Sequence, residues 1–157
     1  MRLEKLLKAY AKCLVTLDGL WFLAAERKLG LEEAASLDAE VWREYACREL
    51  RRVAEAIGAE VKGIADLATV APYLPWLMLN DYVIEVSGSA LRLKVTYCRP
   101  QEARIRRVIR RFPCRRVGEE YFRGLVECLE RPARVRCLGC PPDRPAGAWC
   151  IWEISEE

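Results

Sequence analysis

The chain has 157 residues, of which 52% are hydrophobic and 31% charged, and its formal net charge is +3. This length and composition predict a single domain over residues 1–157 that is large enough for a hydrophobic core. The sequence contains no histidine. Imidazole is therefore excluded as a base, a proton carrier or a metal ligand, and any site must use thiolates, carboxylates, guanidinium groups and backbone.

Neither end of the chain has the pattern of a targeting or membrane segment. The N-terminal residues carry mixed charge and lack the apolar stretch of a signal peptide. The longest uncharged stretch, residues 67–80, is too short to span a bilayer and contains Pro72 and Pro75. We therefore expect a cytoplasmic protein with no membrane partner.

Apolar residues recur at spacings of three and four through the first 80 residues, which is the period of a helix. This pattern predicts a helix over residues 3–29, a short helix over residues 31–37, and a longer helix that Asp38 caps and Gly58 ends. A third helical stretch is expected over residues 64–79, interrupted or kinked by its prolines.

From Asp81 onward the hydrophobic period changes to two, which is typical of strands. The expected elements are strands over residues 82–86 and 91–97, helices over 101–111 and 119–129, and strands over 134–138 and 149–154. The predicted fold class is therefore α+β. Residues 1–80 supply the N-terminal helices, and residues 81–157 supply a small antiparallel sheet made of two hairpins with two helices between them.

Three cysteines near the end of the chain have the spacing of a metal site. Cys137 and Cys140 form a Cys-x-x-Cys pair, and Cys150 lies on the strand that returns after a loop. We expect these three thiolates to bind one metal ion with Cys98 as the fourth ligand and Cys114 as its substitute. Four thiolates suit zinc, and they equally suit an iron–sulfur cluster. The alternative is that these thiols are small buried hydrophobic groups.

Cys98 and Cys114 are also candidates for reactive, catalytic thiolates. Cys98 precedes a predicted helix and lies next to Arg99, and helix-end N–H groups and cations lower the pKa of a thiol. Cys114 has a similar electropositive setting because Arg115 and Arg116 follow it. Since histidine is absent, Glu102 is the candidate for a carboxylate base.

The remaining cysteines have no predicted chemistry. Eight cysteines in a cytosolic protein favour metal binding or reactive thiols over a disulfide framework. Cys13, Cys47 and Cys128 fall within helical patterns, so they are interpreted as packing residues.

Asp18 is a further candidate for a catalytic group because it lies within an apolar part of the first helix. A buried carboxylate needs a partner, which either a functional pocket or an ion pair at a helix contact would supply. Arg99 and Arg104 are the candidates for orienting the carboxylate of an anionic ligand. Trp21 is a candidate for the wall of a ligand cavity, although tryptophan at helical spacing is more often part of the core.

The basic residues are concentrated in one segment. Residues 99–136 contain twelve arginines and five glutamates. Such a segment could attract nucleic acid or a small anion. Solvated helix faces are the favoured interpretation, because few aromatic residues are present to stack on bases.

Several segments resemble an uncharacterised prokaryotic family of small cysteine-containing proteins; they are residues 18–26, 37–42, 98–104, 112–114, 137–143 and 149–153. More distantly, the layout is similar to L-2-amino-thiazoline-4-carboxylate hydrolase-like domains and to 4-vinyl-reductase-type ligand-binding domains. These similarities imply a small-molecule pocket with cysteines at its rim. The hydrolase similarity would imply opening of a cyclic C–N bond.

The sequence therefore favours a cytoplasmic small-molecule-binding protein with a cysteine-rich metal or thiolate site, whose enzymatic form would be a hydrolase of a small anionic substrate. The alternative is a ligand-sensing or nucleic-acid-binding module with a structural zinc ion. A homodimer is a further expectation, since the apolar segment around Trp76 could line either a pocket or a dimer interface.

Overall fold

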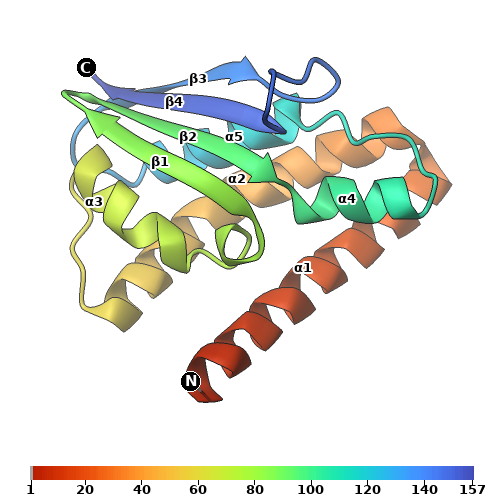
Figure 1. The fold of residues 1–157 in the computed structure, drawn as a ribbon, viewed down its shortest axis with the longest axis horizontal. Helices are drawn as coiled ribbons and strands as arrows, with labels where there is room; N and C mark the ends of the chain where they lie inside the picture. The colour runs from red at the N-terminus through yellow and green to blue at the C-terminus, as the bar shows by residue number, and fades with distance from the viewer. Residues whose placement is uncertain (1) are drawn as a thin grey trace.

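Helices form the first part of the chain and most of the sheet lies in the second, as the computed structural model of residues 2–157 shows (Figure 1). The elements in chain order are α1 (Arg2–Leu29), α2 (Leu31–Ile57), α3 (Ile64–Val70), β1 (Asp81–Ser87), β2 (Ala90–Tyr97), α4 (Arg99–Arg106), α5 (Arg115–Val126), β3 (Ala133–Gly139) and β4 (Cys150–Glu156). Two short 3-10 turns, Ala71–Tyr73 and Leu77–Leu79, connect α3 to β1. The predicted α+β class is confirmed.

The four strands form one antiparallel sheet in the order β1-β2-β4-β3. The two predicted hairpins are present, and they join where β2 pairs with β4, with Leu93 opposite Trp152. Leu93 and Trp152 are buried, whereas Glu153, on the opposite face, forms ion pairs with Arg92 and Arg136. The alternation of apolar and charged residues therefore gives the sheet one buried face and one solvated face.

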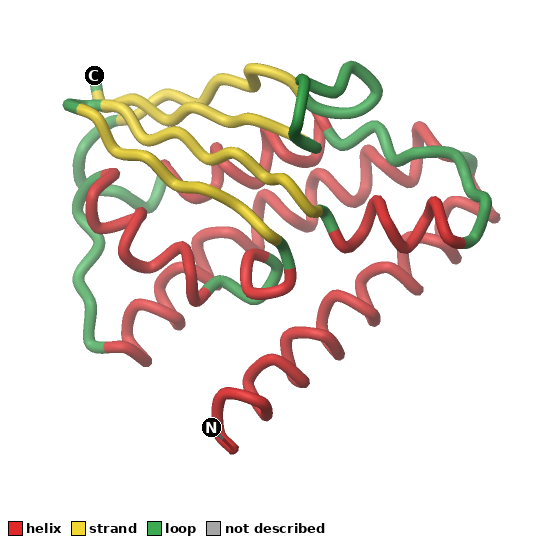
Figure 2. Tube along the Cα trace, in the orientation of Figure 1, coloured by secondary structure: helices red, strands yellow, loops and turns green. Residues whose placement is uncertain are grey.

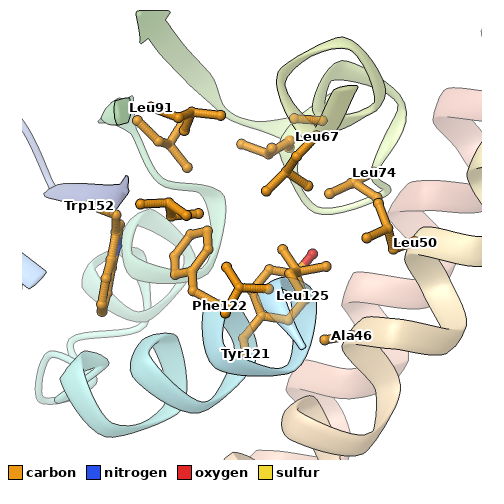
Figure 3. Packing of buried hydrophobic residues seen from close by; sticks show 14 of the residues in the cluster. Ala46, Leu50, Leu67, Leu74, Leu91, Tyr121, Phe122, Leu125 and Trp152 are labelled. Carbon is orange, nitrogen blue, oxygen red and sulfur yellow. The ribbon is translucent and has the colours of Figure 1, made fainter. Parts of the chain in front are cut away.

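Helices α3 and α5 contact the buried face of the sheet, and α2 packs against α5. The chain trace in Figure 2 shows these helices on one side of the strands. Gly124 of α5 lies against the backbone carbonyl of Arg43 and the side chain of Ala46 in α2, so a Cβ atom there would collide with α2. Next to this contact, Phe122 packs against Trp152 of the sheet (Figure 3), whereas Tyr121 packs against Trp42 of α2.

Helix α1 has a largely exposed apolar face. Its N-terminal half extends away from the body (Figure 1), and Ala11 is its single buried residue among those described. The exposed apolar side chains of α1 include Leu3, Leu6, Leu7, Tyr10, Leu17 and Trp21. Within residues 2–157, no helix combines the length and the apolar composition needed to cross a bilayer.

Three element boundaries differ from the sequence prediction. Helix α2 is continuous from Leu31, so Asp38 lies inside it and is not an N-cap. Helix α4 ends at Arg106 because the backbone of Val108 adopts a φ of 56°, which is incompatible with a right-handed helix. Helix α5 begins four residues earlier than expected, with Cys114 as its N-cap residue.

The structure also corrects the interpretation of two cysteines. Cys47 of α2 and Cys128, just after α5, form a disulfide with a Cα–Cα distance of 5.7 Å. The two helices lie against each other, which brings these positions together although they are 81 residues apart in the sequence. The helical pattern of each segment could not indicate this pairing.

Candidate functional site

A cavity of about 340 Å³ lies where α1 meets α4 and the segment after it. The residues that line it are Val15, Thr16, Asp18, Gly19, Leu20, Phe22, Leu23, Asp38, Arg99, Pro100, Ala103, Arg104, Arg107, Ile109 and Phe112. Most of the lining is apolar, with acidic and basic side chains among it. This composition is typical of a small-molecule site.

One wall of the cavity carries two carboxyl groups, Asp18 of α1 and Asp38 of α2. Burial raises the pKa of Asp18 to about 6, which a hydrogen bond from the Trp42 indole partly offsets. Burial, followed by the negative charge of Asp18, raises the pKa of Asp38 to about 7, again opposed by Trp42. The pair therefore holds protons more tightly than ordinary aspartates do.

The basic residues of the lining, Arg99, Arg104 and Arg107, come from α4 and the residue that follows it. Arg104 is buried, and its guanidinium donates two hydrogen bonds to Glu26 at 2.8 and 3.0 Å and one to the carbonyl of Arg110 at 2.7 Å. Arg104 is thus fully used in joining α4 to α1. In contrast, Arg99 and Arg107 form no ion pair with any of residues 2–157, so their charges are available to a ligand.

Five cysteines gather at one end of the sheet, and we call them the thiol cluster. Cys98 follows β2, Cys114 caps α5, Cys137 and Cys140 lie at and just after the end of β3, and Cys150 begins β4. Cys137 and Cys114 both lie close enough to Cys140 for interactions between these thiols to raise the pKa values of Cys137 and Cys140. Cys150 is close enough to Cys98, Cys137 and Cys140 for their charges to affect its pKa.

The surroundings of four members of the thiol cluster, Cys98, Cys137, Cys140 and Cys150, raise their pKa values and so favour the protonated thiol. The hydrogen bond to Cys114, and then burial, raise the pKa of Cys140 well above its usual value. Burial raises the pKa of Cys137 and of Cys150 to about 12. It raises the pKa of Cys98 to about 11, and the neighbouring Glu102 contributes to this shift. The predicted lowering of the Cys98 pKa at the start of a helix is therefore wrong, because burial dominates.

The donor set of the thiol cluster suits a thiophilic metal, but the geometry of the side chains does not. Within residues 2–157, no group of three or more Cys, Asp or Glu residues is arranged to hold a metal ion. The side chains of the cluster would have to turn toward a common point in order to bind one.

Helix α4 connects the cavity to the thiol cluster. Cys98 is its N-cap residue, and Arg99, the first helical residue, lines the cavity. Gln101 is almost fully buried, and its side-chain amide donates a hydrogen bond to the carbonyl of Phe112 at 2.8 Å and lies 3.7 Å from Sγ of Cys114. Gln101 therefore links Phe112, which lines the cavity, to Cys114 of the thiol cluster.

Of the predicted site residues, Trp21 and Glu102 do not line the cavity. Two charged residues that line it, Asp38 and Arg107, were not predicted from the sequence as site residues. Trp21 is 72% exposed on the outer face of α1, and Glu102 is half-buried beside Cys98. Sequence analysis missed Asp38 and Arg107, which lie on the cavity wall. Placing Asp38 inside a continuous helix, four residues before Trp42, would have put it on the same helix face as that indole.

A second buried carboxyl group lies deeper in the helical layer. The Tyr121 hydroxyl donates a hydrogen bond to Oε2 of Glu49 at 2.7 Å, and the Trp76 indole donates one to that hydroxyl at 2.8 Å. Oε1 of Glu49 is buried and has no hydrogen-bond partner among residues 2–157. Burial raises the pKa of Glu49 to about 7.

The fold and the site define an α+β protein with a cavity that has charged and apolar lining, beside a group of thiols. The chain belongs to the family of unknown function DUF6125, whose model matches residues 2–156. The predicted membership of an uncharacterised family is thus confirmed, while the more distant similarities to hydrolase and 4-vinyl-reductase domains are not.

The other comparisons support the fold of this chain and give no information about its chemistry. No curated protein matches the chain. A similar solved structure is that of a trafficking protein particle complex subunit 3 from Naegleria fowleri, covalently bound to palmitic acid. It superposes with a TM-score of 0.55 over 98% of this chain and 95% of that chain, at 10% sequence identity. This similarity establishes the fold alone.

Proposed function

We propose that this protein binds a small, carboxylate-bearing ligand with an apolar body in the cavity between α1 and α4. The observation that carries this proposal is the cavity itself, in which Arg99 and Arg107 lie beside apolar side chains without an acidic partner among residues 2–157. Guanidinium groups bind carboxylates through paired, charge-assisted hydrogen bonds.

Binding accounts for these residues better than hydrolysis does. A cysteine nucleophile acts as a thiolate, and the raised pKa of Cys98 leaves its thiol neutral near pH 7. Cys98 also lies beside Glu102, whose negative charge opposes ionisation. We therefore propose a binding or ligand-sensing module, and the cytoplasmic location expected from the sequence is part of this proposal.

Calorimetric titration with 3-phenylpropanoate tests the binding function, since this probe has one carboxylate and one aromatic ring. We expect saturable binding to the wild type and a roughly tenfold loss of affinity in Arg99→Gln or Arg107→Gln. Arg51→Gln is the matched control, because Arg51 is an exposed arginine that does not line the cavity. Equal affinity in all four proteins would contradict the proposal.

A second candidate function concerns the thiol cluster, for which we propose zinc binding by Cys114, Cys137, Cys140 and Cys150. The proximity of both Cys137 and Cys114 to Cys140 favours this set over one that includes Cys98. Zinc would supply the positive charge that clustered thiolates need in order to ionise together. An iron–sulfur cluster would use the same donors.

Metal analysis of protein purified without oxygen or chelators distinguishes these outcomes. One zinc ion per chain that is lost in Cys140→Ser and retained in Cys13→Ser would support the proposal, because Cys13 is exposed on α1. Iron with visible absorbance would instead identify an iron–sulfur cluster. Metal-free wild-type protein would contradict both.

A further inference from the structure

The charged groups of the cavity have opposite signs and come from different elements. Asp18 and Asp38 belong to α1 and α2, whereas Arg99 and Arg107 belong to α4 and its C-terminal end. We propose that the cavity takes a zwitterionic ligand of the α-amino-acid type with an apolar side chain. Its ammonium group would lie against Asp18 and Asp38, and its carboxylate against Arg99 and Arg107. This inference rests on the proposed binding function and names the ligand class of that same site.

The acidic wall, formed by Asp18 and Asp38, has no positively charged partner among the described residues and could bind a cation. Asp18 and Asp38 face the same cavity from two packed helices and are close enough for the charge of one to raise the pKa of the other. Neither forms an ion pair with any of residues 2–157, and the Trp42 indole is the polar side chain that hydrogen-bonds to both. Ionising two half-buried carboxyl groups that have no counter-ion is costly, and an ammonium group would let both ionise.

The basic wall is held in position independently of any ligand. Arg104, at the centre of α4, is bound to Glu26 of α1, and this ion pair fixes α4 against the helix that carries Asp18. Arg99 begins α4 and Arg107 directly follows it, so the two arginines flank Arg104 about two helical turns apart, with no acidic partner in the described part of the chain. The backbone that carries both cations is therefore fixed before a carboxylate binds, which lowers part of the entropy cost of binding.

The apolar side chains that line the cavity would contact the apolar side chain of such a ligand. Phe22 and Phe112 meet edge to face with ring centroids 4.8 Å apart, and Leu23 and Ile109 also line the cavity. The volume of about 340 Å³ lies at the lower end of the range for small-molecule sites, which favours a compact ligand over a long chain.

Three probes that share a phenyl ring separate the contributions of the two walls. They are L-phenylalanine, which is zwitterionic, phenethylamine, which has only the ammonium group, and 3-phenylpropanoate, which has only the carboxylate. Calorimetric titrations at pH 7.5 should rank L-phenylalanine tightest, by roughly tenfold over each single-charge probe. Asp38→Asn should remove the advantage of L-phenylalanine over 3-phenylpropanoate without weakening 3-phenylpropanoate itself. Glu40→Gln, an exposed change on the same helix, should leave the ranking intact.

The outcomes separate failure of this inference from failure of the proposed function. If 3-phenylpropanoate binds as tightly as L-phenylalanine to the wild type, the ligand-class inference is wrong while the binding function stands. If none of the three probes binds at millimolar concentration, both are wrong. The ranking of the three probes is measured on wild-type protein and does not depend on any variant. If Asp38→Asn fails to fold, Asp18→Asn replaces it as the variant that removes one acidic group.

Discussion

The side-chain amide of Gln101 in α4 donates a hydrogen bond to the backbone carbonyl of Phe112 and lies 3.7 Å from Sγ of Cys114. The same side chain accepts a hydrogen bond from the backbone N–H of Phe112 at 3.2 Å. Phe112 lines the cavity and Cys114 belongs to the thiol cluster. One buried glutamine therefore fixes the segment that connects the two features.

Replacing this glutamine should loosen that segment. In Gln101→Ala, the N–H and C=O groups of Phe112 lose their partner, so we expect the free energy of unfolding to fall by about 1–3 kcal/mol. Cys114 should react faster with iodoacetamide, measured by mass spectrometry of the native protein. The exposed substitution Thr69→Ala is the control, and an alkylation rate of Cys114 in Gln101→Ala equal to that in this control would contradict the prediction.

The Arg104–Glu26 ion pair should be essential for the position of α4. Both side chains are largely buried, with 9% and 19% of their surface exposed, so removing one partner leaves an uncompensated charge. We expect Arg104→Ala or Glu26→Ala to destabilise the protein by about 3–5 kcal/mol. The double variant should cost less than the sum of the two single variants, by roughly 1–3 kcal/mol in chemical denaturation. Strict additivity would show that the two side chains do not interact.

Glu49 should make the protein less stable at higher pH. Its folded-state pKa of about 7 lies above its ordinary value of 4.5, so the folded state holds this proton more tightly than the unfolded state does. The resulting stabilisation is complete below about pH 4.5, where both states are protonated, and is lost as the pH rises through 7. The shift corresponds to at most about 3 kcal/mol.

Denaturation of the wild type and of Glu49→Gln at pH 5 and at pH 8 checks this prediction. The glutamine retains an acceptor for the Tyr121 hydroxyl but cannot ionise, so the stability of the variant should fall less between the two pH values. Asp18 and Asp38 titrate in both proteins, and the difference between the proteins isolates Glu49. Glu44→Gln, exposed on the same helix, should behave as the wild type. Parallel pH profiles for the wild type and Glu49→Gln would refute the account of this carboxyl group.

The Cys47–Cys128 disulfide should stabilise the contact between α2 and α5. It closes a loop across a separation of 81 residues, which in a chain-entropy treatment corresponds to about 4 kcal/mol. We expect oxidised wild-type protein to lose several degrees of melting temperature in dithiothreitol. The Cys47→Ser/Cys128→Ser variant should show no such response. A dithiothreitol effect of equal size in that variant would mean that another cysteine is responsible.

The sequence predicted local structure well, and its failures have physical causes. The change of hydrophobic period at Asp81 located the sheet, and both hairpins formed as expected. The error at Asp38 arose because aspartate favours both helix N-caps and buried pockets, and local sequence cannot distinguish the two. The length of α4 was overestimated because the left-handed backbone at Val108 has no signal in its residue type.

The candidate site was predicted in part for a related reason. The Cys-x-x-Cys spacing indicated that Cys137 and Cys140 lie together, and the strand pairing brings Cys150 to the same end of the sheet. The partnership of Cys140 with Cys114 depends on how α5 packs against β3, which no local pattern encodes. The same holds for Asp38 beside Asp18, since that contact depends on the packing of α1 against α2.

A nuclear magnetic resonance titration of ¹⁵N-labelled protein with 3-phenylpropanoate tests the central claim most directly. The account predicts saturable shift changes for the amides of residues 15–23 and 99–112, which extend to Cys98 and Cys114 through α4 and the segment after it. Shift changes confined to the exposed leucine face of α1 near Leu3 and Leu6, or none at all, would contradict it.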